Sequence, residues 1–258
     1  MRLLNVLVLG FSTMLMNHEV QAATDQDYAQ ALSAWARVLE RYVDDEGRTD
    51  FIALADDSTD LQQYVDVVAE FGPNSNPDAF DGPGAVLAYH ANTYNALAMY
   101  GVIEEGIPEG FGSFFKRAGF FKFRKVRVDG DDTNLYDYEN RVIRPLGEPR
   151  IHFALNCMVR DCPRLPRQPF PANGLEDVLE AATWEFFSKP RHLQIDHDKR
   201  RVSVSAILDF YTKDFVPSGR ARDLGAYINR YLEQPLPPDY KIKFITYDWT
   251  INQQPRGG

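Results

Sequence analysis

The sequence predicts an α+β fold: a single compact domain with a buried central helix packed against a small, mainly antiparallel sheet and surrounding helices. Three observations indicate this class. One long apolar segment lacks charged residues, several segments repeat apolar residues at helical spacing, and short alternating segments follow no regular β-α order. The chain has 258 residues, of which 44% are hydrophobic and 25% charged, so it has the composition of an ordinary globular protein.

Helices dominate the first hundred residues. Apolar residues recur at helical spacing over 28–42, and the polar turn 44–47 ends that helix. A second amphipathic helix is predicted around 61–68. Residues 72–84 are rich in turn formers and predict a loop. Residues 84–103 contain no charged side chain, so they predict the buried central helix.

The rest of the chain mixes short strands and helices. Alternating hydrophobicity predicts strands, including one hairpin, at 121–128, 150–156, 192–196, 201–204 and 241–249. Helical spacing predicts helices at 135–146, 205–215 and 224–232.

The N-terminus has the pattern of a secretory signal peptide over residues 1–22. Arg2 provides the positive charge, residues 3–15 the apolar segment, and Val20-Gln21-Ala22 the small-x-small cleavage site. An uncleaved anchor is the alternative. Because no cysteine precedes Cys157, no lipobox is present, and we expect a periplasmic or secreted protein with one domain over residues 23–258.

The charge and hydropathy of the chain exclude several classes of partner. A net charge of −9 disfavours binding to nucleic acid or to an anionic membrane surface, which both require basic patches. After residue 22 the chain has no uncharged apolar segment of eighteen residues, so we expect no stable membrane insertion after signal cleavage.

Two amides interrupt the predicted central helix. Asn92 and Asn95 lie about 60° apart around the helix axis, on the face that also carries Ala88 and Met99. Small neighbours and two amides indicate that a ligand or another backbone segment approaches closely, so both asparagines are candidate ligand-binding residues. In the alternative interpretation they hold buried loops, because buried polar groups are normally hydrogen-bonded.

Glu139 is a charged residue at a position where the helical pattern predicts an apolar one. It falls within an apolar stripe of the predicted 135–146 helix, formed by Leu135, Tyr138, Val142, Ile143 and Leu146. A carboxylate among apolar neighbours costs several kcal/mol unless it is paired or protonated. Glu139 is therefore a candidate catalytic residue, or else a structural anchor for a histidine, an arginine or a backbone amide.

His152 is the candidate partner of Glu139. In a strand over 150–156 it shares the less apolar face with Ala154 and Asn156. Imidazole is the commonest general base, and a carboxylate fixes its tautomer. The alternative is a histidine that is simply satisfied within the core.

The two cysteines, Cys157 and Cys162, enclose four residues and precede Pro163. In an exported protein this spacing favours a disulfide around a tight loop. A nucleophilic Cys157 served by His152 is one alternative, and two inert thiols are another. A straight strand would put His152 and Cys157 on opposite faces, about 16 Å apart. The cysteines and five histidines show no metal-ligand spacing, so no metal and no cofactor is expected.

These segments together resemble the family of domain of unknown function 547 (DUF547), over most of the mature sequence. The matching stretches are 42–51, 89–97, 134–144, 150–165, 204–215 and 242–252. The resemblance includes Asn92, Tyr94 and Asn95 on the central helix, and His152, Asn156, Cys157 and Cys162 in the paired-cysteine segment. It departs from the family at Asn140, which stands where a histidine is usual after Glu139. The family has no established activity.

A remoter similarity links the buried helix and histidine-bearing strand to papain-like and transglutaminase-like thiol enzymes. Those enzymes carry the catalytic cysteine at the start of the helix, but residues 84–103 contain none.

The sequence leaves two functions open. The first is an exported binding or structural module with a polar cluster of Glu139, His152 and the asparagines Asn92, Asn95 and Asn156, for an unidentified small-molecule, peptide or glycan ligand. The alternative is an extracytoplasmic hydrolase or acyltransferase that uses His152 with Glu139, and Cys157 as nucleophile if it is unpaired. A partner-binding surface at Tyr247 and Trp249 is a further possibility, although terminal aromatic residues more often pack onto their own domain.

Overall fold

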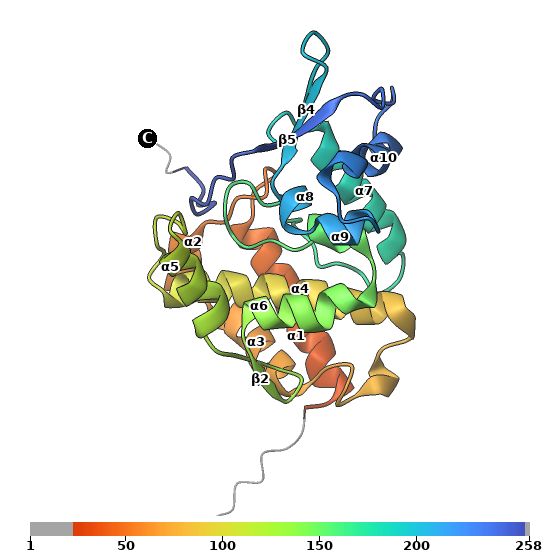
Figure 1. The fold of residues 1–258 in the computed structure, drawn as a ribbon. Coiled ribbons are helices and arrows are strands. Elements are labelled where there is room, and N and C mark those ends of the chain that lie inside the picture. Colours follow the sequence, from red (N-terminus) through yellow and green to blue (C-terminus); the bar gives the residue numbers. More distant parts are fainter. Residues whose placement is uncertain (1–22, 256–258) are drawn as a thin grey trace, which may run out of the picture.

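The computed structural model describes residues 23–255, so the predicted signal peptide, residues 1–22, lies outside the described part. The α+β class is confirmed. Most elements are helical, and two small sheets are present (Figure 1). Within the described residues no helix has the length and apolar character needed to cross a bilayer.

The N-terminal helices build the first of two hydrophobic cores. They are α1 (Asp25–Tyr42), α2 (Phe51–Asp56), α3 (Thr59–Glu70) and the short 3₁₀ helix η1 (Pro77–Ala79). The helix predicted at 28–42 begins three residues earlier because Thr24 and Asp27 form a capping box, with the Thr24 hydroxyl accepting from the Asp27 amide. Trp35 of α1 stacks on Tyr64 of α3 at 5.8 Å between ring centroids.

The central helix α4 (Gly82–Glu104) is buried on almost every side, as its uncharged sequence predicts. It contacts helices rather than a sheet: α3 and α2 from the N-terminal part, and α7 (Leu175–Ser188) from the C-terminal part. In Figure 1 it crosses the middle of the molecule, with α1 and α3 labelled below it and the C-terminal helices α7, α8, α9 and α10 above it.

The strand predicted over 121–128 is mostly wrong. Residues 114–123 are helical, as α5 (Phe114–Ala118) and a π-helical segment, η2 (Gly119–Phe123). Only β1 (Val126–Val128) is extended, and it pairs antiparallel with β2 (Asp131–Thr133). The phenylalanines at 120–123 instead lie on different faces of a helix: Phe120 is buried, whereas Phe123 is 73% exposed.

The helix predicted over 135–146 is present, with an uneven pitch. It begins as α6 (Leu135–Asp137), widens into the π-helical segment η3 (Tyr138–Ile143), and tightens into the 3₁₀ turn η4 (Arg144–Leu146). π-helical turns are rare and often mark functional sites.

The strand predicted over 150–156 is wrong. Residues Pro149–Phe153 form a 3₁₀ helix, η5. Pro149 at its first turn fits a helix start, and the Glu148 side chain accepts from the Arg150 amide as a cap. Ion pairs from Arg150 to Glu176 (2.7 Å) and Glu180 (3.1 Å) hold η5 against α7.

The C-terminal part builds the second core around a three-stranded sheet. The predicted hairpin is confirmed as β3 (Leu193–Asp196) and β4 (Arg201–Ser205), which pair antiparallel. The final strand β5 (Lys241–Ile245) is shorter than predicted and pairs parallel with β4. The helices of this part are α8 (Ile207–Phe210), α9 (Thr212–Phe215), η6 (Ala221–Asp223), α10 (Leu224–Ile228) and η7 (Asn229–Tyr231).

The chain after β5 returns to the first core. Isolated bridges join Thr250 to Gly110, Ile251 to Val159 and Gln253 to Thr49. Glycine is required at 110, because a Cβ atom there would lie 2.5 Å from the Trp249 carbonyl oxygen. This return places Tyr247 and Trp249 beside α5 and α8.

Candidate functional site

One open pocket of about 470 Å³ lies where α4, η3, η5, α8 and the C-terminal segment meet. Its wall is largely aromatic, with Tyr94, Phe114, Phe121, Tyr136, Phe210, Tyr211, Tyr247 and Trp249. Its polar lining includes the three predicted catalytic residues, Glu139, His152 and Cys157, together with Cys162, the predicted disulfide partner. The structure therefore brings together, in an accessible space, the side chains proposed as acid, base and nucleophile.

Glu139 is buried, as predicted, and its side chain is 10% exposed. The predicted stripe itself is only partly buried, because Val142 and Leu146 are exposed where the helix changes to π and 3₁₀ pitch. The Tyr94 hydroxyl of α4 donates to its Oε2 at 3.3 Å. Its Oε1 faces His152 Nδ1 at 4.0 Å, which is too long for a hydrogen bond.

His152 is fixed on its other side by Asp214, which the sequence analysis did not identify. The Nε2 atom lies 2.8 Å from Asp214 Oδ2. Arg144 binds the same carboxylate through two atoms, with Nε at 2.6 Å and Nη2 at 2.8 Å. The imidazole ring also stacks on Tyr211, with ring centroids 3.9 Å apart. The ring is thus held in one orientation, with Nδ1 toward Glu139.

Asp214 remains ionised in this arrangement. Burial raises the pKa of its carboxyl group, but the hydrogen bonds from His152 and Arg144 outweigh burial and hold that pKa well below its ordinary value. A stable anion therefore stands behind the histidine, as in an Asp-His catalytic pair.

The predicted disulfide is absent from the structure, where both cysteines are free thiols. The Cys162 sulfur accepts from the Cys157 amide at 3.1 Å and from the Tyr247 hydroxyl at 3.5 Å. Cys157 lies partly exposed in the pocket, and Cys162 is buried behind it.

The pKa values of the two thiols are shifted in opposite directions. Burial raises the pKa of Cys162, but hydrogen bonds from Cys157, Tyr247 and the backbone outweigh burial and lower it overall. The Cys157 pKa is raised, because Cys157 hydrogen-bonds to Cys162 and is itself desolvated. Cys162 is therefore the more acidic of the two thiols, and Cys157 holds its proton more tightly.

The separation of about 16 Å expected between His152 and Cys157 rested on a strand geometry of about 3.3 Å per residue. A 3₁₀ helix rises only about 2.0 Å per residue, and residues 154–156 then turn. Both side chains consequently line one pocket. Within the described residues, no hydrogen bond joins His152 to either sulfur.

The three asparagines do not line the pocket; they hold backbone. Asn95 donates to the Ala154 carbonyl at 2.9 Å and accepts from the Asn156 amide at 2.7 Å. Asn156 donates to the Pro163 carbonyl and accepts from the Met158 amide, both at 2.7 Å. Asn92 likewise donates to the Phe170 carbonyl and accepts from the Phe170 amide, both at 2.9 Å. Their hydrogen bonds match the structural alternative raised by the sequence.

Asn140, which follows Glu139, also lines the pocket and accepts from Arg144. It supports the arginine that holds Asp214 and supplies no second imidazole. Among residues 23–255 there is no group of three or more His, Cys, Asp or Glu side chains arranged to hold a metal ion.

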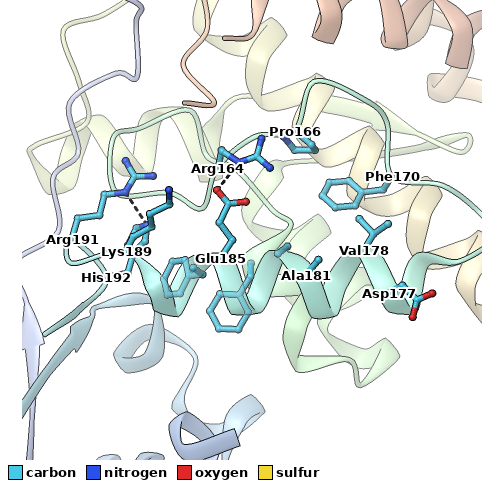
Figure 2. Close-up of a pocket in the computed structure, with 13 residues that line it drawn as sticks. Arg164, Pro166, Phe170, Asp177, Val178, Ala181, Glu185, Lys189, Arg191 and His192 are labelled. Carbon is cyan, nitrogen blue, oxygen red and sulfur yellow. Dashed lines mark hydrogen bonds and ion pairs between the residues drawn. The ribbon is translucent and has the colours of Figure 1, made fainter. Parts of the chain in front are cut away.

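A second, smaller hollow of about 290 Å³ lies between α7 and the loop that carries Arg164 and Phe170 (Figure 2). The ion pair of Arg164 with Glu185, at 2.6 Å, spans it. At one end, Arg191 donates to the buried His192 at 3.0 Å. Burial lowers the pKa of His192 to about 3, so this imidazole is neutral at ordinary pH. No predicted site residue lines this hollow.

Comparison with known proteins agrees with the family resemblance. The family model described as "Protein of unknown function, DUF547" matches residues 83–187. That stretch runs from α4 to α7 and contains Glu139, His152 and both cysteines, whereas Asp214 lies beyond it. Neither the comparison with curated proteins nor that with solved structures finds a match.

Proposed function

We propose that this chain, a member of the DUF547 family through residues 83–187, is a thiol-dependent enzyme that transfers or hydrolyses acyl groups. One observation carries the proposal: a single open pocket is lined by two free sulfurs and by a histidine oriented by an ionised carboxylate. A nucleophile, a proton carrier and a group that orients the carrier are the parts that such chemistry requires.

Cys157 is the proposed nucleophile, because it is the more exposed of the two sulfurs. In the active form of this proposal Cys162 is a thiolate, stabilised by the Tyr247 hydroxyl and the Cys157 amide, and it accepts the Cys157 thiol proton. The Cys157 sulfur then attacks the acyl carbonyl carbon and forms a thioester as the leaving group departs.

His152 is the proposed proton carrier for the leaving group and for the incoming water or acceptor. In the first half-reaction, protonated His152 gives its proton to the leaving group. In the second half-reaction, it takes a proton from the water or acceptor that attacks the thioester, and the Cys157 thiolate departs and regains its proton from Cys162. Asp214 acts as a positioning residue, since it fixes the ring through Nε2.

The aromatic wall indicates the kind of acyl compound. Eight aromatic side chains surround the polar lining, and pockets of this composition bind ligands with an apolar body and one polar end. A peptide or an acylated glycan with an apolar group beside the reacting carbonyl fits this description.

The test uses p-nitrophenyl acetate as acyl donor and iodoacetamide as thiol reagent. Wild-type protein should release p-nitrophenolate, and Cys157→Ser should lower the rate about 100-fold or more. His152→Gln should lower turnover, while the matched control His197→Gln, an exposed histidine bonded to Tyr240, should leave it unchanged. Ester hydrolysis by Cys157→Ser at the wild-type rate contradicts the proposal.

A binding module is the second candidate, and one observation favours it. Both ring nitrogens of His152 face carboxylates, with Asp214 at 2.8 Å and Glu139 at 4.0 Å, and neither contacts a sulfur. In that case His152→Gln and Cys157→Ser would leave ester hydrolysis at background. Iodoacetamide would then label Cys157 no faster in the wild type than in a Cys162→Ser variant, which lacks the proposed proton acceptor.

We also propose that the protein acts outside the cytoplasm, after removal of residues 1–22. The pattern of those residues supports this, as does the capping box at Thr24, which starts the first helix directly after the cleavage site. The N-terminal residue of protein recovered from the periplasm or medium should be Ala23, as measured by mass spectrometry. Recovery of the intact N-terminus in the cell pellet alone contradicts export.

A further inference from the structure

Three phenylalanines in one short segment are exposed to an unusual degree. Phe114, Phe115 and Phe123 of α5 and η2 are 69%, 84% and 73% exposed. Phe114 and Phe115 are in contact, with ring centroids 5.8 Å apart, and Phe123 follows in the same segment. Exposed aromatic side chains scattered over a surface need no explanation, but several within one short segment indicate an interaction site. The segment lies at the edge of the molecule, at the left of Figure 1.

The same segment carries a local positive charge in an acidic protein. Residues 112–128 contain six arginines and lysines and no acidic residue. Four of them form two adjacent pairs, at 116–117 and 124–125, and the other two are Lys122 and Arg127. Lys116, Lys122 and Lys125 are exposed. Arg117 and Arg124 are half-buried: Arg117 donates to the Phe111 carbonyl, and Arg124 lies near Tyr100. Arg127 is exposed but forms ion pairs with Glu70 and Asp132, so the three lysines are the charges available to a partner.

The segment is held firmly from beneath. Phe120 is fully buried and packs on Phe111 at 4.3 Å between ring centroids. Phe121 packs against Phe120 at 4.9 Å and against Trp249 at 6.4 Å. The outward phenylalanines and lysines are thus presented by an anchored element rather than by a loose loop.

We propose that residues 114–125 dock this protein onto a bilayer surface rich in anionic lipid. Rings enter the boundary between headgroups and acyl chains while ammonium groups bind lipid phosphates, which is the pattern of interfacial helices. The net charge of −9 disfavours an anionic membrane for the chain as a whole, but it acts only weakly on a local group of lysines, because charges more than about 10 Å away are largely screened at 0.1 M salt. This is surface binding, distinct from insertion of a spanning helix.

The docking surface adjoins the pocket. Phe114 and Lys122 belong to the segment and also line the pocket that holds Glu139, His152 and Cys157. Lys122 lies over the Tyr136 ring at 4.1 Å, at the same pocket. Docking would therefore bring the pocket up to the lipid surface. The inference goes beyond the proposed chemistry and does not depend on it.

The test is co-sedimentation with vesicles of phosphatidylcholine alone or of phosphatidylcholine with phosphatidylglycerol, using full-length protein as purified from its producing cells. The variants Lys116→Gln/Lys125→Gln and Phe115→Ser/Phe123→Ser leave all pocket-lining residues intact. Each lysine contributes a factor of about 5 to binding, so the lysine variant should bind anionic vesicles about 25-fold more weakly. The phenylalanine variant should lose at least about tenfold.

The matched controls change the same residue types elsewhere. Lys199→Gln/Lys243→Gln removes two exposed lysines at the β3–β5 sheet, and Trp184→Ser removes an exposed aromatic side chain of α7. Both should sediment like the wild type. Equal sedimentation of wild type with both vesicle types, or wild-type binding by either segment variant, overturns the proposal; the former result would favour a protein partner. Because sedimentation measures no catalysis, its outcome is independent of the ester assay.

Discussion

Replacement of Asn95 by leucine should separate the architecture of the site from the stability of the fold. The Asn95 amide makes two hydrogen bonds to the backbone between His152 and Cys157, at 2.9 Å to Ala154 and 2.7 Å from Asn156. Leucine has a similar size and makes neither bond. Each buried backbone group left without a partner costs about 1–3 kcal/mol, so the free energy of unfolding should fall by about 2–6 kcal/mol.

Asn92→Leu is the matched control, because Asn92 makes the same two bonds to Phe170 three residues earlier on α4. Its loss should cost a similar free energy, with a small addition for the Trp35 indole, which donates to it at 3.3 Å. Only Asn95→Leu, however, frees the segment that positions His152 and Cys157. Its ester hydrolysis and its rate of Cys157 alkylation should change, whereas Asn92→Leu should retain wild-type rates when folded.

Urea unfolding gives the free energies, and iodoacetamide labelling with mass spectrometry gives the thiol rates, both under conditions where each variant remains folded. Two results would refute the reasoning. The first is a loss below 1 kcal/mol for Asn95→Leu, since two unpaired buried groups cannot cost so little. The second is an identical change of thiol reactivity in both variants. In that case the backbone bonded by Asn95 would position Cys157 no more than the backbone bonded by Asn92 does.

Two further predictions concern titratable groups. Burial lowers the pKa of His90 to about 4 and of His192 to about 3, while the unfolded chain protonates near 6.5. The unfolded state thus binds more protons below that value, and stability should fall by about 4 kcal/mol from pH 7 to pH 5, as measured by urea unfolding; a constant stability refutes this. Asp214→Asn should lower ester turnover about 100-fold or more by releasing His152, while Asp209→Asn, a nearby exposed carboxylate, should leave the rate unchanged.

Long periodic segments were predictable from the sequence. The helix over 28–42, the uncharged helix over 84–103 and the buried position of Glu139 follow directly from spacing, because a helix fixes which residues share a face. The hairpin 192–204 followed from alternation around a polar turn. In each case, local pattern and tertiary burial agree.

The segment 150–156 shows why alternation can mislead. Ile151 and Leu155 are buried in the first core and Phe153 in the second, so residues two apart contribute to different cores. The sequence therefore shows the alternating hydrophobicity of a strand, although the segment is a 3₁₀ helix between the two cores in which His152 and Ala154 are buried as well. Pro149 and the Glu148 cap were the local signals of a helix start, and they outweigh an alternation of only three apolar residues.

Asp214 could not be assigned from the sequence, because its role arises from contacts across the fold. It lies 62 positions from His152 and 70 from Arg144, its two partners. Nothing in the local spacing of α9 distinguishes it from an exposed helix carboxylate. Tyr211, three residues earlier, stacks on the same imidazole, so one short stretch supplies both the anion and the ring that orient His152.

The asparagines of α4 position the segments that form the site, but their own side chains do not line the pocket. Because α4 is surrounded by protein, its side-chain polar groups can bind only neighbouring segments. Tyr94 donates to Glu139 on one side, and the adjacent Asn95 holds the backbone that leads to Cys157 on the other. One turn of a single buried helix therefore sets the spacing between the acidic and the thiol parts of the pocket. Asn92 and Asn95 are therefore better explained as residues that hold the backbone around the site than as residues that bind its ligand.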